Sequence, residues 1–439
     1  MTTTPRLMAL LAAAAAALAV SCDGAHTAAR PNVLVLVMDT TRADRCSFLG
    51  YSRGTTPRLA EFAKDAVTFS DAWAPCCWTG PSHASLFTGL RPEHHGYLES
   101  MRRHLSDQET TLAERFRDAG WRTGCFTNNE LVSREMGLTQ GFDRIEPLYK
   151  DEKRPYPWAA QTHRRALEWA LSKQEAGRPF FLFVNDMEPH LPYEPPPAVA
   201  ARFVQGSPSA AELDSARAFN FPWSVGYVLG KTEVPPRKLS LLSDLYDGEI
   251  AALDEEVGRL LDGLKTAGVL DDTIVVVCSD HGESLGEHRV LGHLFSMHRS
   301  TLHVPLLVRW PGKFDGGSVV SDLVRLEDVA PTLLELCQLP PIEGADGVSL
   351  TGGLEGRVAR GIFGEQLHAM EQIARAFPDA DLSIYKTSIR SAYDGRLHYL
   401  RSSTGREELY DVRRDPGESN DLAPQGGPDL ERLRALLAE

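Results

Sequence analysis

The sequence predicts an α/β fold, a sandwich with a mostly parallel central sheet, followed by a smaller C-terminal α+β part. Apolar runs rich in β-branched residues recur along the chain, and each is followed by polar residues or by a helical pattern. Continuous apolar runs are typical of parallel strands buried on both faces, and their alternation with helices is typical of layered α/β domains. The 439 residues, 42% of them apolar, are enough to bury such a core.

The strands and helices of the first part follow from these patterns. The clearest strands are the apolar runs 33–38, 180–184, 273–278 and 304–309. Helical patterns cover 112–119 and 243–267, and the longer one carries early acidic residues and stops at Gly268. Residues 191–240 are rich in proline and glycine with weak periodicity, so we expect a long excursion over the mouth of a site.

The pattern changes after about residue 320, where the predicted elements become shorter. They are a helix near 326–336 and strands at 361–364, 388–393 and 397–401. This change predicts an α/β domain over residues 30–320 and a C-terminal α+β subdomain over residues 321–439.

The N-terminal segment 1–22 has the pattern of a secretory signal. One early positive charge, Arg6, precedes an apolar run over 7–20, and small residues precede Cys22. The ending LAVSC also resembles a lipoprotein box, in which a lipidated Cys22 becomes the mature N-terminus and attaches the protein to a membrane. Simple cleavage and an uncleaved anchor are the alternatives. We therefore expect a periplasmic or envelope-anchored protein.

Charge and cysteine content narrow the function classes. The formal net charge of −14 argues against a nucleic-acid partner, because such a surface repels a phosphate backbone. Six cysteines remain beyond Cys22, and an oxidising compartment could pair them. They are Cys46, Cys76, Cys77, Cys125, Cys278 and Cys337.

Acidic and histidine side chains follow the predicted strands where a parallel sheet binds its ligands. In SDHGESLGEH, Asp280 and His281 leave a buried strand side by side, and a carboxylate with an imidazole is a common pair of ligands for divalent metals. An aspartate that caps a helix and bonds to its neighbouring histidine is the alternative. Asp39 follows another strand and adds a second carboxylate, which favours the metal site.

The stretch TGPS at residues 79–82 has the pattern of a helix start. Thr79 or Gly80 lies near the cap, Pro81 lies in the first turn, and the short helix ends at Gly89. A hydroxyl at the positive end of a helix, next to a metal ion, is activated as a nucleophile. Thr79 could therefore attack a phosphorus or sulfur centre, whereas a threonine that only caps the helix is the alternative.

With these motifs in place, the chain resembles the sulfatase family, arylsulfatase-like members of the alkaline phosphatase superfamily. The matching motifs run in family order from residue 31 to about 423, and they include NVLVLVMDTTRADRCSFLGY, WTGPSHASLFTGLRPEHHG, EPHLPY, SDHGESLGEH and VPLLVRWPG. The resemblance implies an alkaline-phosphatase-like sandwich. It also implies metal ligation by Asp39, Thr79, Asp280 and His281, with Thr79 as the nucleophile. His190 and His293 match positions that contact the ester or hold a second metal, and one of them would protonate the leaving oxygen as a catalytic residue.

The chain departs from the family pattern at positions that matter for chemistry. Sulfatases carry CxPSR or SxPSR, whose cysteine or serine becomes formylglycine, whereas this chain has Thr79 followed by GPSH, and threonine does not yield that aldehyde. Cys76 and Cys77 lie outside the required spacing. Thr40 replaces the usual second aspartate, and CFTNNE at 125–130 replaces a GKWHLG-like segment. Asn128 or Asn129 could contact a bound anion there, and Asn128 is our candidate.

We interpret the sequence as a metal-dependent hydrolase that cleaves phosphate or related esters through Thr79. Sulfate ester hydrolysis without formylglycine, transfer of a phospho group and a catalytically silent binding protein are the alternatives. The expected substrate is a small-molecule, glycan or lipid ester. The expected ion is calcium, magnesium or manganese, or zinc if His190 and His293 form a second site with Asp186 or Glu188.

Overall fold

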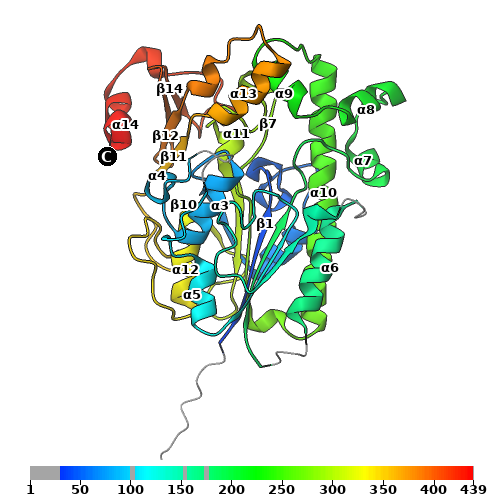
Figure 1. The fold of residues 1–439 in the computed structure, drawn as a ribbon, viewed down its shortest axis with the longest axis vertical. Coiled ribbons are helices and arrows are strands. Elements are labelled where there is room, and N and C mark those ends of the chain that lie inside the picture. Colours follow the sequence, from blue (N-terminus) through cyan, green and yellow to red (C-terminus); the bar gives the residue numbers. More distant parts are fainter. Residues whose placement is uncertain (1–29, 99–103, 152–155, 173–176, 439) are drawn as a thin grey trace, which may run out of the picture.

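The computed structural model describes residues 30–98, 104–151, 156–172 and 177–438 (Figure 1). The predicted signal at 1–22, with Cys22, lies outside these residues. None of the described helices combines the length and the apolar character that a membrane crossing requires. Within the described ranges no disulfide forms: the six cysteines that an oxidising compartment could pair are all buried free thiols.

A large mixed sheet forms the centre of the molecule. Its eight strands lie in the order β10-β2-β9-β6-β1-β5-β3-β4. Their bounds are β1 Asn32–Met38, β2 Val67–Trp73, β3 Arg122–Thr127, β4 Arg144–Pro147, β5 Phe180–Asp186, β6 Thr273–Cys278, β9 His303–Arg309 and β10 Val319–Arg325. The run from β6 through β1, β5 and β3 to β4 is parallel throughout, which confirms the mostly parallel sheet.

Strand β9 differs from the prediction because it runs antiparallel to both of its neighbours, β6 and β2. We expected residues 304–309 to form a parallel strand. A parallel strand would need a crossover that carries the chain back to the end of the sheet where β6 begins. After β6 the chain instead stays at the carboxyl end of that strand, through β7 Ser284–Leu285, β8 Leu291–Gly292 and the short α11 Arg299–Leu302. It then runs back in the opposite direction as β9.

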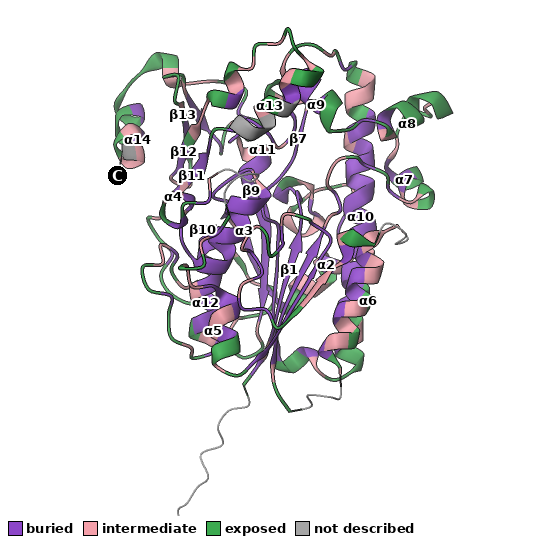
Figure 2. Cartoon of the chain, in the orientation of Figure 1, coloured by how far each residue is buried: buried purple, intermediate pink, exposed green. Residues whose placement is uncertain are grey.

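Helices cover both faces of this sheet (Figure 1). In β1, Leu34, Leu36 and Met38 face one core, which contains α2 Pro57–Phe62, α6 Trp158–Ala170 and α10 Pro236–Thr266. The alternate residues Val33, Val35 and Val37 face the other core, which contains α3 Thr79–Thr88, α5 Leu112–Asp118 and α12 Val329–Leu336. The buried residues in Figure 2 follow this layering through the central strands.

The predicted excursion over 191–240 contains three short helices. They are α7 Pro197–Phe203, α8 Ala210–Arg217 and α9 Phe221–Val228, and their apolar residues pack with the N-terminal part of α10. Helix α10 begins at Pro236, seven residues before the predicted start at residue 243. A proline is favoured in the first turn because its missing N–H needs no partner there.

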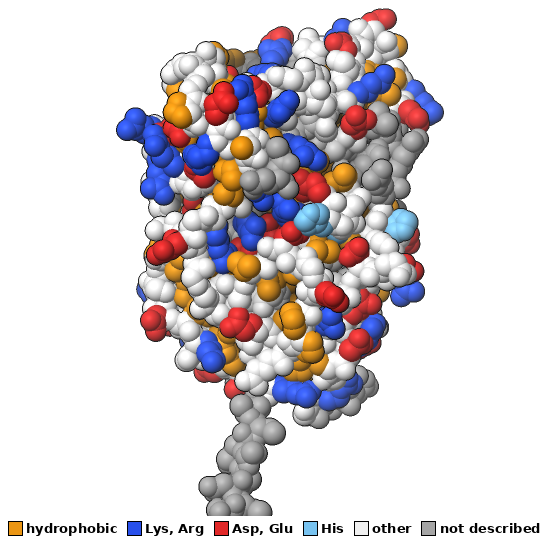
Figure 3. All heavy atoms as spheres, turned by 90° about the vertical axis from the view of Figure 1, so that its left-hand side faces the viewer, with side chains coloured by type: hydrophobic (Ala, Val, Ile, Leu, Met, Phe, Trp, Pro, Cys, Tyr) orange, Lys and Arg blue, Asp and Glu red, His pale blue; other side chains and the backbone are white. Residues whose placement is uncertain are grey.

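A second sheet of four antiparallel strands forms the C-terminal part. Its strands are β11 Ala359–Phe363, β12 Ile389–Tyr393, β13 Leu397–Ser402 and β14 Glu407–Asp411, and α14 Pro428–Ala438 packs on it. Helix α13 Leu367–Ala376 lies between β11 and β12 in the chain. Figure 3 shows basic and acidic side chains interspersed on the side of the molecule toward α14.

The predicted boundary at 320/321 lies inside a strand of the large sheet. Strand β10 pairs with β2 on the edge of that sheet, and Leu333 of α12 belongs to the same core as β1. The C-terminal subdomain therefore starts later than the sequence pattern indicated. The boundary was misplaced because the shorter elements that begin near residue 320 still pack in the core of the large sheet. Only the later elements form the second sheet.

Candidate active site

Two neighbouring parallel strands bring three buried side chains together at one edge of the large sheet. Asp39 follows β1, and Asp280 and His281 follow β6. One ligand atom of each lies within 4.8 Å of the other two, and all three residues are fully buried. In the described part of the chain, this is the group of acidic, histidine and cysteine side chains that has the geometry to hold an ion.

Each aspartate has one satisfied and one unsatisfied oxygen. Asp280 Oδ1 accepts from the backbone N–H of Thr40 at 3.2 Å and of His281 at 2.9 Å, and Asp39 Oδ2 accepts from Asn129 Nδ2 at 2.7 Å. Asp39 Oδ1 and Asp280 Oδ2 have no hydrogen-bond partner among the described residues. Burial, and then the charge of Asp280, raise the pKa of Asp39. Because unpaired buried carboxylates are costly, these oxygens fit a divalent cation.

The imidazole of His281 is held in the form that binds a metal. Its Nδ1 lies 3.0 Å from the backbone oxygen of Gly282, so Nδ1 carries the proton and Nε2 faces the carboxylates. Burial, and then the neighbouring His293, lower the pKa of His281 to about 3. A neutral imidazole is the ligand form, because a protonated nitrogen has no lone pair to offer.

Thr79 lies beside this group at the start of α3. It is the first helical residue and Trp78 is the cap, so neither Thr79 nor Gly80 takes the predicted cap position. The hydroxyl lies 3.5 Å from His281 Nε2 and 3.5 Å from Asn129 Nδ2, and the residue is 3% exposed. The helix ends at Gly89 with φ of 70°, as predicted.

His83 is a site residue that the sequence analysis did not assign. It lies one helical turn after Thr79, and its Nδ1 is 2.9 Å from the Thr79 carbonyl oxygen and 3.5 Å from Asp280 Oδ2. Its Nε2 has no partner among the described residues, and its ring packs edge-on to Phe87 and Phe183. The i, i+4 spacing from Thr79 was the available signal, because it places both residues on one helix face.

The two adjacent asparagines after β3 point to different places. Asn129 donates to Asp39 and lies beside Thr79, whereas Asn128 Nδ2 donates to Thr162 Oγ1 on α6 at 2.6 Å. Our candidate Asn128 is therefore directed away from Thr79, and Asn129 takes the place beside it. The turn separates them, because the Asn129 N–H donates to Thr127 Oγ1 at 3.0 Å and bends the chain.

His190 and His293 lie next to the group around Asp39. The ring centroids of His281 and His293 are 4.4 Å apart, and those of His190 and His293 are 5.1 Å apart. His293 Nδ1 lies 2.9 Å from Glu283 Oε1, and this buried glutamate was also missed. Burial opposes protonation of His293, but Glu283 outweighs it and raises its pKa.

The carboxylates that we considered for a second metal are directed elsewhere. Asp186 Oδ2 lies 2.7 Å from His163 Nε2 on α6, and Glu188 Oε1 accepts from the backbone N–H of Ala159 at 3.2 Å. Neither is grouped with His190 and His293 among the described clusters with metal-binding geometry. Among the described residues, the geometry to hold a cation is therefore found at Asp39, Asp280 and His281 and not at His190 and His293.

The chain matches known families and structures over most of its length. Residues 31–339 match the family model "Sulfatase", and residues 286–437 match "N-sulphoglucosamine sulphohydrolase, C-terminal". An arylsulfatase of Clostridium perfringens is 23% identical, with 90% of each chain covered. An N-acetylglucosamine-6-O-sulfatase of Bacteroides thetaiotaomicron is also 23% identical, with 90% of this chain and 82% of the relative covered.

The fold is also that of a solved relative. The phosphonate monoester hydrolase of Agrobacterium radiobacter superposes with a TM-score of 0.74 at 24% identity, covering 93% of this chain and 94% of the other. The family-model match, together with these relatives, defines the class of protein as an ester hydrolase. Within it, this chain belongs to the sulfatase family, because that family model matches well over half of its length.

Proposed function

We propose that this protein is a metal-dependent hydrolase that cleaves phosphate or related esters with Thr79 as its nucleophile. One observation carries the proposal: the buried Thr79 hydroxyl lies 3.5 Å from His281 Nε2 at the edge where Asp39 and Asp280 meet. A threonine at this position has no route to formylglycine, which is the nucleophile suited to sulfate release. Direct attack by an alkoxide suits phosphorus better.

The side chains that would hold the ion are Asp39, Asp280 and His281, with the Thr79 oxygen as a fourth ligand. When bound, a calcium, magnesium or manganese ion supplies positive charge that lowers the pKa of Thr79 and stabilises the transferred group. Oxygen ligands with one imidazole fit these ions. The unsatisfied oxygens of Asp39 and Asp280 support this assignment.

The reaction then depends on residues of this chain. Thr79 Oγ1 loses its proton to water and attacks phosphorus, the bond to the leaving oxygen breaks, and Asn129 donates a hydrogen bond to an oxygen of the transferred group. His293, oriented by Glu283, or His190 gives a proton to the leaving oxygen. Water then cleaves the phosphothreonine. An alcohol in place of water would make the enzyme a transferase.

Sulfate ester hydrolysis is the second candidate function. It is favoured by the family match and by the names of the two curated relatives, both of which are sulfatases. Under either candidate the substrate would be a small-molecule, glycan or lipid ester. The signal-like segment 1–22 supports action in the periplasm or at the envelope, with membrane attachment through a lipidated Cys22.

The test is a substrate panel on the purified metal-loaded protein, with aryl sulfate, phosphate monoester, phosphate diester and phosphonate. We expect turnover of a phosphorus ester and a phosphoryl adduct on Thr79 by mass spectrometry. Thr79→Ala should lose this turnover. Thr88→Ala on the same helix should keep it, because Thr88 bonds only to the helix and the adjoining turn. Sulfate turnover that survives Thr79→Ala would overturn the nucleophile, and no turnover of any ester would favour the silent binding protein.

A further inference from the structure

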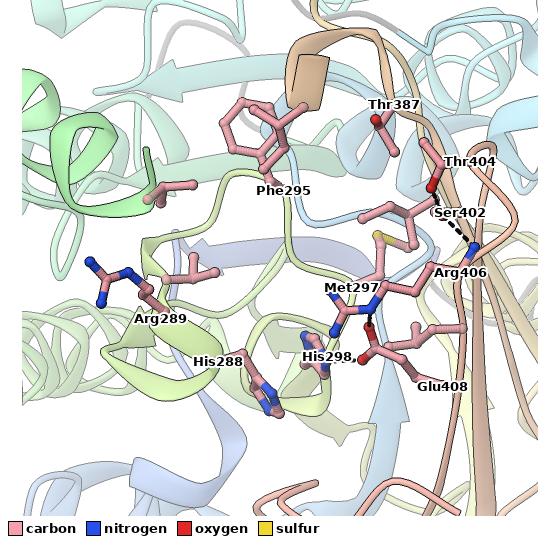
Figure 4. Close-up of a pocket in the computed structure, with 15 residues that line it drawn as sticks. His288, Arg289, Phe295, Met297, His298, Thr387, Ser402, Thr404, Arg406 and Glu408 are labelled. Carbon is pink, nitrogen blue, oxygen red and sulfur yellow. Dashed lines mark hydrogen bonds and ion pairs between the residues drawn. The ribbon is translucent and has the colours of Figure 1, made fainter. Parts of the chain in front are cut away.

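A pocket of about 380 Å³ lies between the C-terminal sheet and the segment that follows β7 (Figure 4). The labelled side chains in Figure 4 come from two parts of the chain, with His288, Phe295, Met297 and His298 from the segment after β7 and Ser402, Thr404 and Arg406 from the C-terminal sheet and its turn. The volume lies in the range of small-molecule sites. None of its lining residues belongs to the group around Thr79, so it is a separate cavity.

One part of the pocket wall is apolar. Phe295 and Met297 contribute from the loop after β8, and Ile384, Ile389 and Leu400 contribute from the C-terminal part. Phe295 is held in place edge-on against Tyr385, with ring centroids 4.6 Å apart. Such a wall favours a ligand with an apolar ring or chain, because that surface leaves water on binding.

The charged groups of the wall are already paired with one another. Arg406 Nε lies 2.8 Å from Glu408 Oε1, and Glu408 Oε2 lies 3.0 Å from His298 Nε2. Arg289 Nη2 lies 3.0 Å from Glu233 Oε1. The His298–Glu408 pair is nearly buried, so a charged ligand that took one of its partners would leave the other unpaired at a cost, whereas the exposed Arg289–Glu233 pair costs little to break. The wall therefore favours a neutral ligand.

Hydroxyl groups give the pocket its remaining polar contacts. Ser402, Thr404 and Thr387 lie on the side of the C-terminal sheet, and each offers an oxygen that accepts hydrogen bonds. A small neutral amphipathic molecule fits this lining, because its apolar ring would contact the apolar residues and its N–H or O–H would donate to the hydroxyl oxygens.

The pocket and the candidate active site share one segment of chain. Residues 288–290, 295, 297 and 298 line the pocket, and His293 of the same segment lies beside His281. A ligand that contacts Phe295 and Met297 would thus contact the segment only two residues from His293, and could shift its backbone. His288, Arg289 and Phe295 all have φ between 52° and 60°, so the segment holds an uncommon backbone shape that packing must maintain.

We infer that this cavity is a binding site for a neutral amphipathic small molecule, and that its occupancy changes how the segment 286–298 positions His293. The binding part stands by itself, and the effect on turnover rests on the proposed function. His293 contacts the ester in that proposal, so an effector bound here changes catalysis without occupying the reaction site.

The binding test compares two probes that share one ring skeleton, using the Thr79→Ala protein so that catalysis does not enter. N-phenyl-1-naphthylamine is neutral, and 1-anilinonaphthalene-8-sulfonate adds one negative charge. We expect the neutral probe to bind at least tenfold more tightly. Thr404→Trp, which fills the rim, and Ile384→Glu, which places a charge in the apolar wall, should each weaken the neutral probe at least tenfold. Ser403→Trp, at the adjacent exposed turn residue, should change the affinity for the neutral probe less than twofold.

Equal binding to the Thr404→Trp, Ile384→Glu and Ser403→Trp proteins, each with an unchanged melting temperature, would overturn the site. Tighter binding of the anionic probe would overturn the neutral class. For the coupling, the neutral probe should slow hydrogen exchange in segment 286–298 and change kcat/KM for the panel ester at least threefold, with both effects lost in Thr404→Trp. Binding without either effect would overturn the coupling. If no ester is turned over, the proposed function fails while the binding and exchange results still decide the pocket.

Discussion

The two sheets of this molecule treat buried charge in opposite ways. At the carboxyl edge of the large sheet, Asp39 Oδ1 and Asp280 Oδ2 are buried without a hydrogen-bond partner among the described residues. In the C-terminal sheet, Glu408 is contacted by His298, Tyr410 and Arg406. The first region leaves buried carboxylate oxygens without a partner among the described residues, whereas the second pairs its charge internally. Under the proposed function, the first region performs the chemistry and the second lines the pocket near Met297.

Two glutamates show the same contrast in their pKa values. Burial among other carboxylates raises the pKa of Glu249, on α10 of the large domain, to about 8. Burial also opposes ionisation of Glu408, but His298, Tyr410 and Arg406 outweigh it and lower its pKa to about 2. The surroundings, and not the residue type, decide which form the folded protein prefers.

The largest expected effect is at the unbalanced carboxylates. Asp280→Asn should lose bound metal and lower kcat/KM by about 10³-fold or more, because it removes both a ligand and a negative charge from the cation site. Metal content and steady-state kinetics measure this. Asp271→Asn is the matched control, since the Asp271 side chain accepts from Arg309 and lies just before β6, at the opposite end of that strand from Asp280. Normal metal content in Asp280→Asn would contradict the assignment.

The next effect separates the two adjacent asparagines. Asn129→Ala should lower kcat/KM by about 10 to 100-fold, because it removes a donor beside Thr79 and Asp39. Asn128→Ala should leave kcat/KM within threefold, because its amide donates to Thr162. If Asn128→Ala were the more damaging change, the placement of these two side chains at the site would be wrong.

Metal binding should also stabilise the fold. A divalent ion at about 100 times its Kd contributes about 2.7 kcal/mol to the free energy of unfolding, so the melting temperature should rise by several degrees and fall again with a chelator. In Asp280→Asn this dependence should disappear. Scanning calorimetry with and without the ion makes the measurement, and an equal shift in both proteins would place the ion elsewhere.

The raised pKa of Glu249 predicts a slope of stability with pH. Folded Glu249 keeps its proton up to about pH 8, whereas the unfolded side chain loses it near 4.5, so stability falls as pH rises between these values. Glu249→Gln should remove on the order of 2 to 4 kcal/mol of this fall. Urea unfolding at pH 5 and pH 8 tests it, and an unchanged slope in the variant would argue against a neutral Glu249.

The smallest effect is the opposite slope at Glu408. Its folded pKa of about 2 lies below the unfolded value, so its contribution is complete above pH 4.5 and is lost as pH falls toward 2. Glu408→Gln should therefore flatten the acid side of the stability curve. Acid unfolding followed by circular dichroism would show this, and a midpoint identical to that of the unchanged protein would remove Glu408 from the comparison.

Much of the site was predictable because strand ends are readable from sequence. Apolar runs end at Met38 and Cys278, so the sequence predicts that Asp39, Asp280 and His281 lie together at the carboxyl ends of their strands. The start of α3 was readable from TGPS in the same way. These are local patterns, and local patterns decide where an element ends and which residue follows it.

Tertiary structure alone decided the rest. The choice between Asn128 and Asn129 depends on how the chain turns after β3, and the antiparallel β9 depends on a segment that stays at one edge. The placement of Glu283 and His83 at the site, and the pocket near Met297, depend on packing between residues that are distant in sequence. The sequence determined the chemistry available at the strand ends, and packing decided which side chains meet there, because contact between distant residues depends on the whole fold.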